Sequence, residues 1–142
     1  MSKLNSNVLI WNADYALGYA GIDAEHKEIF DLLKALWSAD PPSKEEAWVI
    51  VTTHLTEQNR HEEEIMYLYL TEDQISEHQE DHHRLQNGLM FERPNSKARI
   101  TMSDEEIELL YRVHIVDFVQ NLLIPHIHKY DALLASQMKL TQ

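Results

Sequence analysis

Apolar side chains recur at steps of three and four residues along four long stretches of the chain, which is the spacing of one buried face of an α-helix. The pattern predicts four helices, over residues 22–39, 44–70, 74–90 and 104–134. The chain has only 3 Gly and 4 Pro, which leaves few places for tight turns. This composition also favours a few long helices over many short strands.

Residues that stop or cap helices mark where the predicted helices begin and end. Asp40-Pro41-Pro42 ends the first helix. A capping box, in which a serine precedes a glutamate by three residues, begins the second helix at Ser43 and the fourth at Ser103. Asp73 is a candidate cap for the third helix. Pro125 lies inside the fourth helix, where we expect a kink.

The predicted fold is all-α. The connections between the first three helices are short, which implies that consecutive helices are antiparallel neighbours, and four such helices form an up-down-up-down four-helix bundle. Residues 1–20 show no helical period, so we expect an N-terminal extended arm laid across the bundle. Residues 91–100 are expected to form a loop. A length of 142 residues fits a single domain covering 1–142.

Charge and composition exclude several classes of protein. The formal net charge of -12 should repel nucleic acid and anionic membrane surfaces, so neither is an expected partner. There is no cysteine, no signal peptide pattern at the start and no apolar stretch long enough to span a bilayer. We therefore expect a cytoplasmic protein. The 9 histidines are an unusually large number, and histidine is the commonest metal ligand.

Each predicted helix carries at least one residue of a metal-ligand type on or near its apolar face. Residues four apart lie about 40° apart around a helix, so both can point at one site. The candidates are His26, Gln58, Glu62, His78, His82, His126 and Asp131. The last two are five apart, and we expect the bend near Pro125 to bring them together. Buried charges are costly unless paired or bound to metal, and imidazole with carboxylate suits iron, manganese or zinc.

Taken singly, these residues have ordinary structural explanations. A lone histidine on an apolar face is usually hydrogen-bonded in the core, and two histidines four apart can be a surface coincidence in an acidic chain. We interpret Glu63 and Glu64 as solvent-exposed. A ferritin-like site needs Glu-x-x-His on two helices, and the chain has this pattern only at Glu80 and His83. Ligand types on all four helices nevertheless favour a metal site.

Four motifs, in order along the chain, resemble those of bacterial hemerythrins. They are Gly21-Ile22-Asp23-x-x-His26-Lys27, Glu62-Glu63-x-Ile65-Met66, His78-x3-His82 and His126-Ile127-x3-Asp131. The resemblance covers nearly the whole chain and implies two irons with a bridging oxo or hydroxo group. It implies bridging roles for Glu62 and Asp131. His78, His82 and His126 would complete the coordination of one iron, and His26 would bind the other together with residue 58.

Two positions depart from the family pattern. Gln58 stands where the family has a histidine ligand, and Leu122 stands where it usually has a tryptophan. The amide of Gln58 is a neutral and weaker ligand than imidazole, so it binds weakly or leaves its position to water. His54 is a candidate for the second coordination shell. We expect an apolar pocket near the ligands, lined by Ile22, Ile29, Leu55 and Leu122.

The resemblance implies a non-enzymatic protein that binds dioxygen, as a carrier, store or sensor. Two alternatives stay open because of Gln58. One is a diiron oxidase or peroxidase, made possible by more open coordination at the second iron. The other is a metal-binding bundle with only one occupied site, held by His78, His82 and His126.

Overall fold

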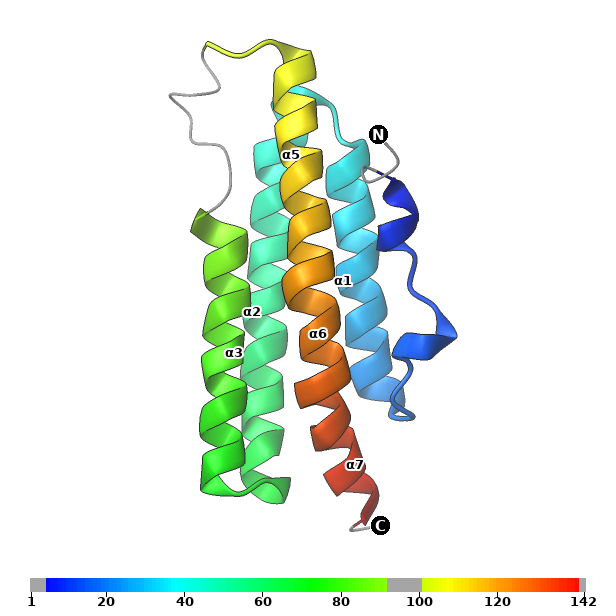
Figure 1. Ribbon diagram of the computed structural model, residues 1–142, viewed down its shortest axis with the longest axis vertical. Helices are drawn as coiled ribbons and strands as arrows, with labels where there is room; N and C mark the ends of the chain where they lie inside the picture. The colour runs from blue at the N-terminus through cyan, green and yellow to red at the C-terminus, as the bar shows by residue number, and fades with distance from the viewer. Residues whose placement is uncertain (1–4, 92–100, 141–142) are drawn as a thin grey trace.

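The computed structural model describes residues 5–91 and 101–140, and within these residues the regular structure is entirely helical. The long helical elements form four rods, and Figure 1 shows these rods side by side. Three of them are single helices, α1 (Ala20–Ser38), α2 (Lys44–Tyr69) and α3 (Glu72–Phe91). The all-α prediction is confirmed. Residues 92–100 of the predicted loop lie outside the described residues, while Phe91 ends α3.

The fourth rod is a continuous helical segment made of five parts. It consists of α5 (Asp104–Phe118), the π-helical turn η4 (Val119–Leu123), α6 (Ile124–His126), the π-helical turn η5 (Ile127–Asp131) and α7 (Ala132–Leu140). Pro125 belongs to α6, between the two π-helical turns. Proline has no N–H to donate and its ring crowds the preceding turn, and a π-helical turn shifts the hydrogen-bond register by one residue.

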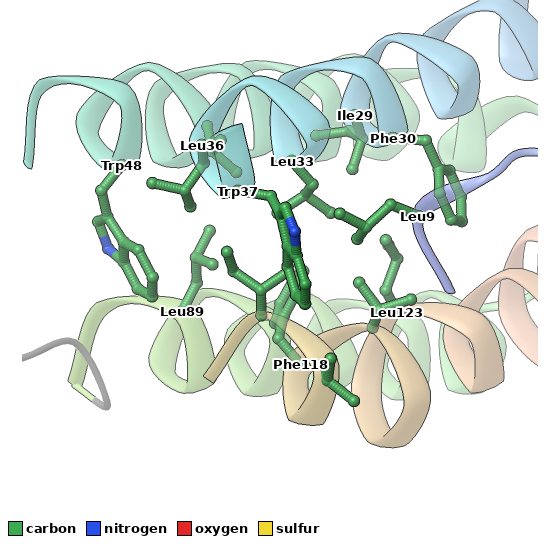
Figure 2. Packing of buried hydrophobic residues seen from close by; sticks show 14 of the residues in the cluster. Leu9, Ile29, Phe30, Leu33, Leu36, Trp37, Trp48, Leu89, Phe118 and Leu123 are labelled. Atoms are coloured by element: carbon green, nitrogen blue, oxygen red, sulfur yellow. The ribbon is translucent and has the colours of Figure 1, made fainter. Parts of the chain in front are cut away.

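Two apolar clusters occupy the space between the rods. The large cluster contains Leu9, side chains of α1 between Ile29 and Trp37, of α2 between Trp48 and Leu55, Leu85 and Leu89 of α3, and side chains of the fourth rod between Ile107 and Ile127. In Figure 2, its side chains from α1 and α2 point toward those from α3 and α5. The small cluster consists of Ile22, Met66, Ile75 and Leu134.

A layer of polar side chains separates the two clusters. On α1, His26 lies between Ile22 of the small cluster and Ile29 of the large one. The same order repeats on α2, where Glu62 lies between Leu55 and Met66. Burying apolar area contributes about 25 cal/mol per Å², so the two clusters stabilise the bundle on both sides of a layer that costs free energy to bury.

The segment before α1 contains two short 3-10 helices, η1 (Ser6–Leu9) and η2 (Ala13–Tyr15), and packs beside α1. The ring of Tyr15 stacks on Phe30 with ring centroids 5.4 Å apart. At the start of α1, the carboxylate of Asp23 accepts hydrogen bonds from the backbone N–H groups of Leu17 and Gly18. The φ of Gly18 is 87°, in the left-handed region that favours glycine. These contacts hold the segment against α1.

A buried lysine ties the end of α1 to the fourth rod. The Lys44 ammonium is fully buried and donates to the backbone carbonyls of Leu36 and Trp37, both at 2.9 Å. It also pairs with the carboxylate of Glu108 at 3.0 Å. A buried charge is tolerated when it is paired and fully hydrogen-bonded, and these three partners meet that condition. None of the described helices is long and apolar enough to cross a membrane.

The sequence predicts caps at the starts of α2, α3 and α5, and the structure caps these three helices in different ways. Ser103 accepts from the backbone N–H of Glu106 at 3.1 Å, and the side chain of Glu106 accepts from the backbone N–H of Ser103, so this predicted capping box is confirmed. The predicted box at Ser43 is wrong. The 3-10 helix η3 (Pro41–Ser43) leads directly into α2, which gives Ser43 a helical conformation from which its side chain makes no capping hydrogen bond.

The third helix is capped by Thr71 rather than by Asp73. The Thr71 hydroxyl accepts from the backbone N–H of Gln74 at 3.2 Å, and the Gln74 side chain accepts from the N–H of Thr71 at 3.0 Å. These are the two reciprocal bonds of a capping box. Asp73 lies inside the first turn of α3, where its negative charge favours the helix dipole without capping the backbone.

The two serines give a matched test of the helix starts. Ser103→Ala should lower the free energy of unfolding by about 1 kcal/mol, because it removes a capping hydrogen bond. Ser43→Ala should change it far less, because Ser43 makes no such bond. Urea denaturation of the two variants beside the unchanged protein measures both values. Equal losses in the two variants would contradict this account of how α2 and α5 begin.

Candidate metal centre

Five ligand-type side chains from three rods meet inside the polar layer. They are Glu62 of α2, His78 and His82 of α3, His126 of α6 and Asp131 of η5, and we call them the ligand cluster. Each offers one ligand atom, and these atoms all lie within 4.8 Å of one another. None of the five side chains is more than a few per cent exposed. A group of this kind, buried and convergent, can hold a metal ion.

Helical geometry brings the members of each pair together in two different ways. His78 and His82 are four apart on the regular helix α3, and their ring centroids are 4.5 Å apart. His126 and Asp131 are five apart, but η5 lies between them, and the backbone N–H of Ala132 donates to the carbonyl of Ile127. This i→i+5 pattern places residues five apart one turn from each other. The His126 Nε2 atom is therefore 3.1 Å from an oxygen of Asp131.

The two carboxylates each present their two oxygens to different neighbours. Oε1 of Glu62 lies 3.0 Å from His82 and 3.3 Å from His78, while Oε2 lies on the side of His26. Oδ1 of Asp131 faces His78 at 3.2 Å, while Oδ2 accepts a hydrogen bond from His26 Nε2 at 2.8 Å. Both carboxylates therefore lie between three histidines on one side and His26 on the other.

Several nitrogens and oxygens of the cluster are close together without hydrogen-bonding. Nε2 of His78, Nε2 of His126 and Oδ1 of Asp131 are all buried and have no hydrogen-bond partner. An unsatisfied buried polar group costs about 1–3 kcal/mol, so three in one place need a physical explanation. A cation bound between them would provide it, because imidazole nitrogens and carboxylate oxygens are the ligand types of iron, manganese and zinc.

Two further carboxylates orient the histidines from outside the cluster. Asp81 accepts a hydrogen bond from Nδ1 of His126 at 2.7 Å, and Glu63 accepts one from Nδ1 of His82 at 3.0 Å. Carboxylates in this position fix the tautomer and ring orientation of metal-ligating histidines, and leave Nε2 free to face the centre. Glu63, interpreted from the sequence as solvent-exposed, is only partly so: 32% of its side chain is exposed, and Gln79 and His82 of α3 both bond to it.

The sequence analysis does not predict a role for Asp81, although its position near two candidate ligand histidines could have indicated one. A ligand histidine usually donates its second N–H to a carboxylate, a backbone carbonyl or water, so an acidic residue beside candidate ligands is itself a candidate hydrogen-bond partner. Asp81 directly precedes His82 and is three residues after His78. The histidine that it bonds is neither of these but His126, 45 residues away, and only the fold brings the two together.

His26 and Gln58 lie beside the cluster, at its edge toward α1. Both are buried, with exposed fractions of 1% and 4%. His26 bonds to Asp131, and the amide nitrogen of Gln58 donates to Oε2 of Glu62 at 3.4 Å. Oε1 of Gln58 has no hydrogen-bond partner. The structure thus brings all seven candidate ligands to one place, and metal binding by each remains a prediction.

The residues expected to line an apolar pocket lie on both sides of the polar layer. Ile29 and Leu55 are buried in the large apolar cluster, with Leu122 packed against it, while Ile22 belongs to the small cluster. His54 is one turn from Gln58 and partly exposed. Its Nδ1 is 3.8 Å from Glu28, and its Nε2 has no hydrogen-bond partner, so neither nitrogen is bonded to the ligand cluster.

Charge within the cluster is strongly coupled. Burial opposes ionisation of Glu62, but the histidines around it outweigh this and lower its pKa to about 2. Burial likewise opposes ionisation of Asp131, and the charge of His126 with its other histidine neighbours holds its pKa well below 3.8. Burial opposes protonation of His126, yet the carboxylates around it raise its pKa well above 6.5. The pKa values of His26 and His78 are raised for the same reason.

No family model matches the chain, and searches of curated proteins and of solved structures find no match either. Over the residues that the structure describes, the fold and the site define an all-helical protein with a buried cluster of histidine and carboxylate side chains that can hold a metal ion.

The metal-free protein should lose stability as pH rises above about 6.5, the ordinary pKa of histidine. A raised pKa of His26, His78 or His126 means that the folded state binds the proton more tightly than the unfolded state. The resulting stabilisation is complete below the unfolded pKa and is lost as pH rises through the folded pKa. The carboxylates act in the opposite direction and only in acid, because their folded pKa values are lowered.

Urea denaturation of the metal-free protein at about pH 6 and about pH 8.5, on either side of most histidine pKa values, measures this effect. We expect a lower free energy of unfolding at the higher pH, and a smaller difference in His126→Gln. Metal affinity should change the other way and rise with pH, because ligand histidines must be deprotonated. A metal-free protein that is equally stable or more stable at the higher pH would contradict the charge distribution described above.

Proposed function

We propose that the protein is a non-haem diiron protein of the hemerythrin type that binds dioxygen at a carboxylate-bridged pair of irons. The observation that carries the proposal is the placement of Glu62 and Asp131, each with one oxygen toward the three histidines and the other toward His26. A carboxylate that bridges two metal ions needs this arrangement, whereas a carboxylate serving one ion does not. The order of the sequence motifs supports the same conclusion.

In this proposal His78, His82 and His126 bind the first iron, and Glu62 and Asp131 bridge the two. The second iron is bound by His26 and, weakly, by Gln58, whose Oε1 is buried and without a hydrogen-bond partner. When bound, the two irons supply the electrons that dioxygen takes up. The protein contributes a buried, water-poor site, with Asp81 and Glu63 holding the rings of His126 and His82.

The proposal also includes the topology of the family, an up-down-up-down antiparallel bundle with an N-terminal arm laid across it. The colours of neighbouring rods in Figure 1 change in opposite directions along their length, which supports this topology. The buried side chain of Leu9 and the stacking of Tyr15 on Phe30 support the arm. We further propose a cytoplasmic carrier, store or sensor of dioxygen that binds neither nucleic acid nor membranes.

One observation favours a second candidate, a protein with a single occupied metal site. The five residues of the ligand cluster form a complete group without His26 and Gln58. In addition, His26 already hydrogen-bonds to Asp131, and Gln58 to Glu62. Three histidines with two carboxylates are sufficient to hold one ion. The replacement of an imidazole by an amide at position 58 weakens the second site rather than the first.

The proposal is tested by visible spectra of the iron-loaded, reduced protein under argon, after admission of air, and after return to argon. We expect an absorption band that forms with dioxygen and is lost when dioxygen is removed. Gln58→His should lengthen the lifetime of this band and slow autoxidation, because imidazole is the stronger ligand. His54→Gln is the matched control, since it changes a nearby histidine that makes no hydrogen bond to the ligand cluster.

Two results would contradict different parts of this proposal. Rapid oxidation without a reversible band, accompanied by turnover of hydrogen peroxide, would replace the carrier with a diiron oxidase or peroxidase. Identical spectra and autoxidation rates for Gln58→His and the unchanged protein would contradict the assignment of position 58 to the second iron.

A further inference from the structure

A groove with a volume of about 590 Å³ lies on the surface between α1 and α2. The residues that line it include three glutamates, two histidines and one glutamine: Glu25, Glu28, His54, Glu57, Gln58 and His61. The remaining lining residues are apolar or threonine, and none is lysine or arginine. The groove is therefore an acidic hollow with imidazole and amide groups along one wall.

Gln58 belongs both to this groove and to the metal centre. It lines the groove, although only 4% of the residue is exposed. Its amide nitrogen donates to Oε2 of Glu62, and its Oε1 is buried without a hydrogen-bond partner. Gln58 therefore contacts both the groove and a carboxylate of the ligand cluster, and its Oε1 has no hydrogen-bond partner.

The negative charge of the groove is largely unpaired. Glu57 lies 3.7 Å from Arg60, so part of its charge is offset. Glu25 and Glu28, by contrast, form no ion pair with a lysine or arginine among the described residues. The carboxylate of Glu28 lies 3.8 Å from Nδ1 of His54. Glu25 interacts electrostatically with His54 and His61 of the groove and also with Glu62 of the cluster.

We propose that the α1–α2 groove is the path by which a divalent cation reaches the buried metal centre. Glu25 and Glu28 attract the hydrated ion, since a hollow lined by one sign of charge concentrates the opposite sign. Oε1 of Gln58 then replaces one of its waters, and Glu62 takes the ion into the cluster. The inference rests on the proposed function only in requiring that the cluster binds a metal.

The same geometry explains why the groove is a path rather than a second resting site. The ligand cluster is the one group of convergent ligand atoms among the described residues. The glutamates and histidines of the groove do not converge in this way. The amide of Gln58 is a neutral ligand and releases a divalent ion more readily than imidazole does. Weak ligands are an advantage on a route that an ion must leave.

Loading of the metal-free protein with Co²⁺, followed by its visible absorption in a stopped-flow instrument, tests the path. The variant is Glu25→Gln with Glu28→Gln, which removes two charges from the groove at nearly constant volume. The matched control is Glu77→Gln with Glu80→Gln on α3. It removes two exposed charges at the same spacing, beside His78 just as Glu25 is beside His26. Far-UV circular dichroism checks that both variants are folded.

We expect the groove variant to load about tenfold more slowly than the unchanged protein, a modest value for electrostatic steering through a charged cleft. Its rate should also depend less on ionic strength, because the steering charges are gone. Final Co²⁺ content should be unchanged. The control should load within about twofold of the unchanged protein, since its charges lie on another surface.

Three outcomes would overturn the path. They are equal loading rates in the groove variant and the unchanged protein, equal slowing in the groove variant and the control, and a lower final Co²⁺ content in the groove variant. The last would make Glu25 or Glu28 part of the site itself. Failure of the unchanged protein to bind Co²⁺ at all would overturn the metal centre together with its path, so the two failures are distinguishable.

Discussion

Two carboxylates in the middle of a helical core are the constraint on which the rest of this structure depends. An ionised carboxylate removed from water costs several kcal/mol unless opposite charge and hydrogen bonds compensate it. Glu62 and Asp131 are compensated by histidines from α1, α3 and the fourth rod, and two of these histidines, His126 and His82, are held in turn by Asp81 and Glu63. The arrangement places the four rods in one register, because a shift of any rod would leave a buried charge unpaired.

The apolar clusters and the backbone are arranged around this polar layer. The large and small clusters lie on either side of it. Burial of their apolar area offsets the free energy that burying the polar layer costs. The π-helical turn η5 gives up regular α-helical bonding where His126 and Asp131 must face the same point. Turns of this kind inside α-helices occur often at functional sites, and here the reason is geometric.

Much of the fold and most of the site follow from the sequence, for reasons that differ between residues. The helical period and the capping box at Ser103 depend on local contacts, and local contacts are visible in a sequence. Ser43 shows the limit, because the 3-10 turn before it changes its backbone conformation and removes the cap. His126 and Asp131 were found as ligand types, but the π-helical turn that joins them depends on how the whole rod packs.

Outer partners are the least predictable part of the site. Asp81 bonds a histidine on another rod, and Glu63 turns toward α3 although it is one of three consecutive glutamates. Neither orientation follows from spacing along the chain, because each depends on the angle and separation of neighbouring helices. The α1–α2 groove is of the same kind, since its glutamates and histidines belong to ordinary amphipathic faces until the two helices are packed together.

The most direct test is the metal content of the freshly purified protein, measured by inductively coupled plasma mass spectrometry and expressed as metal ions per chain. The bridging arrangement of Glu62 and Asp131 predicts about two irons per chain, as in other carboxylate-bridged bundle sites. About one metal ion per chain would contradict the diiron centre and leave the single site of His78, His82 and His126. A protein that retains its stability and binds no metal would contradict the central claim that this buried cluster is a metal centre.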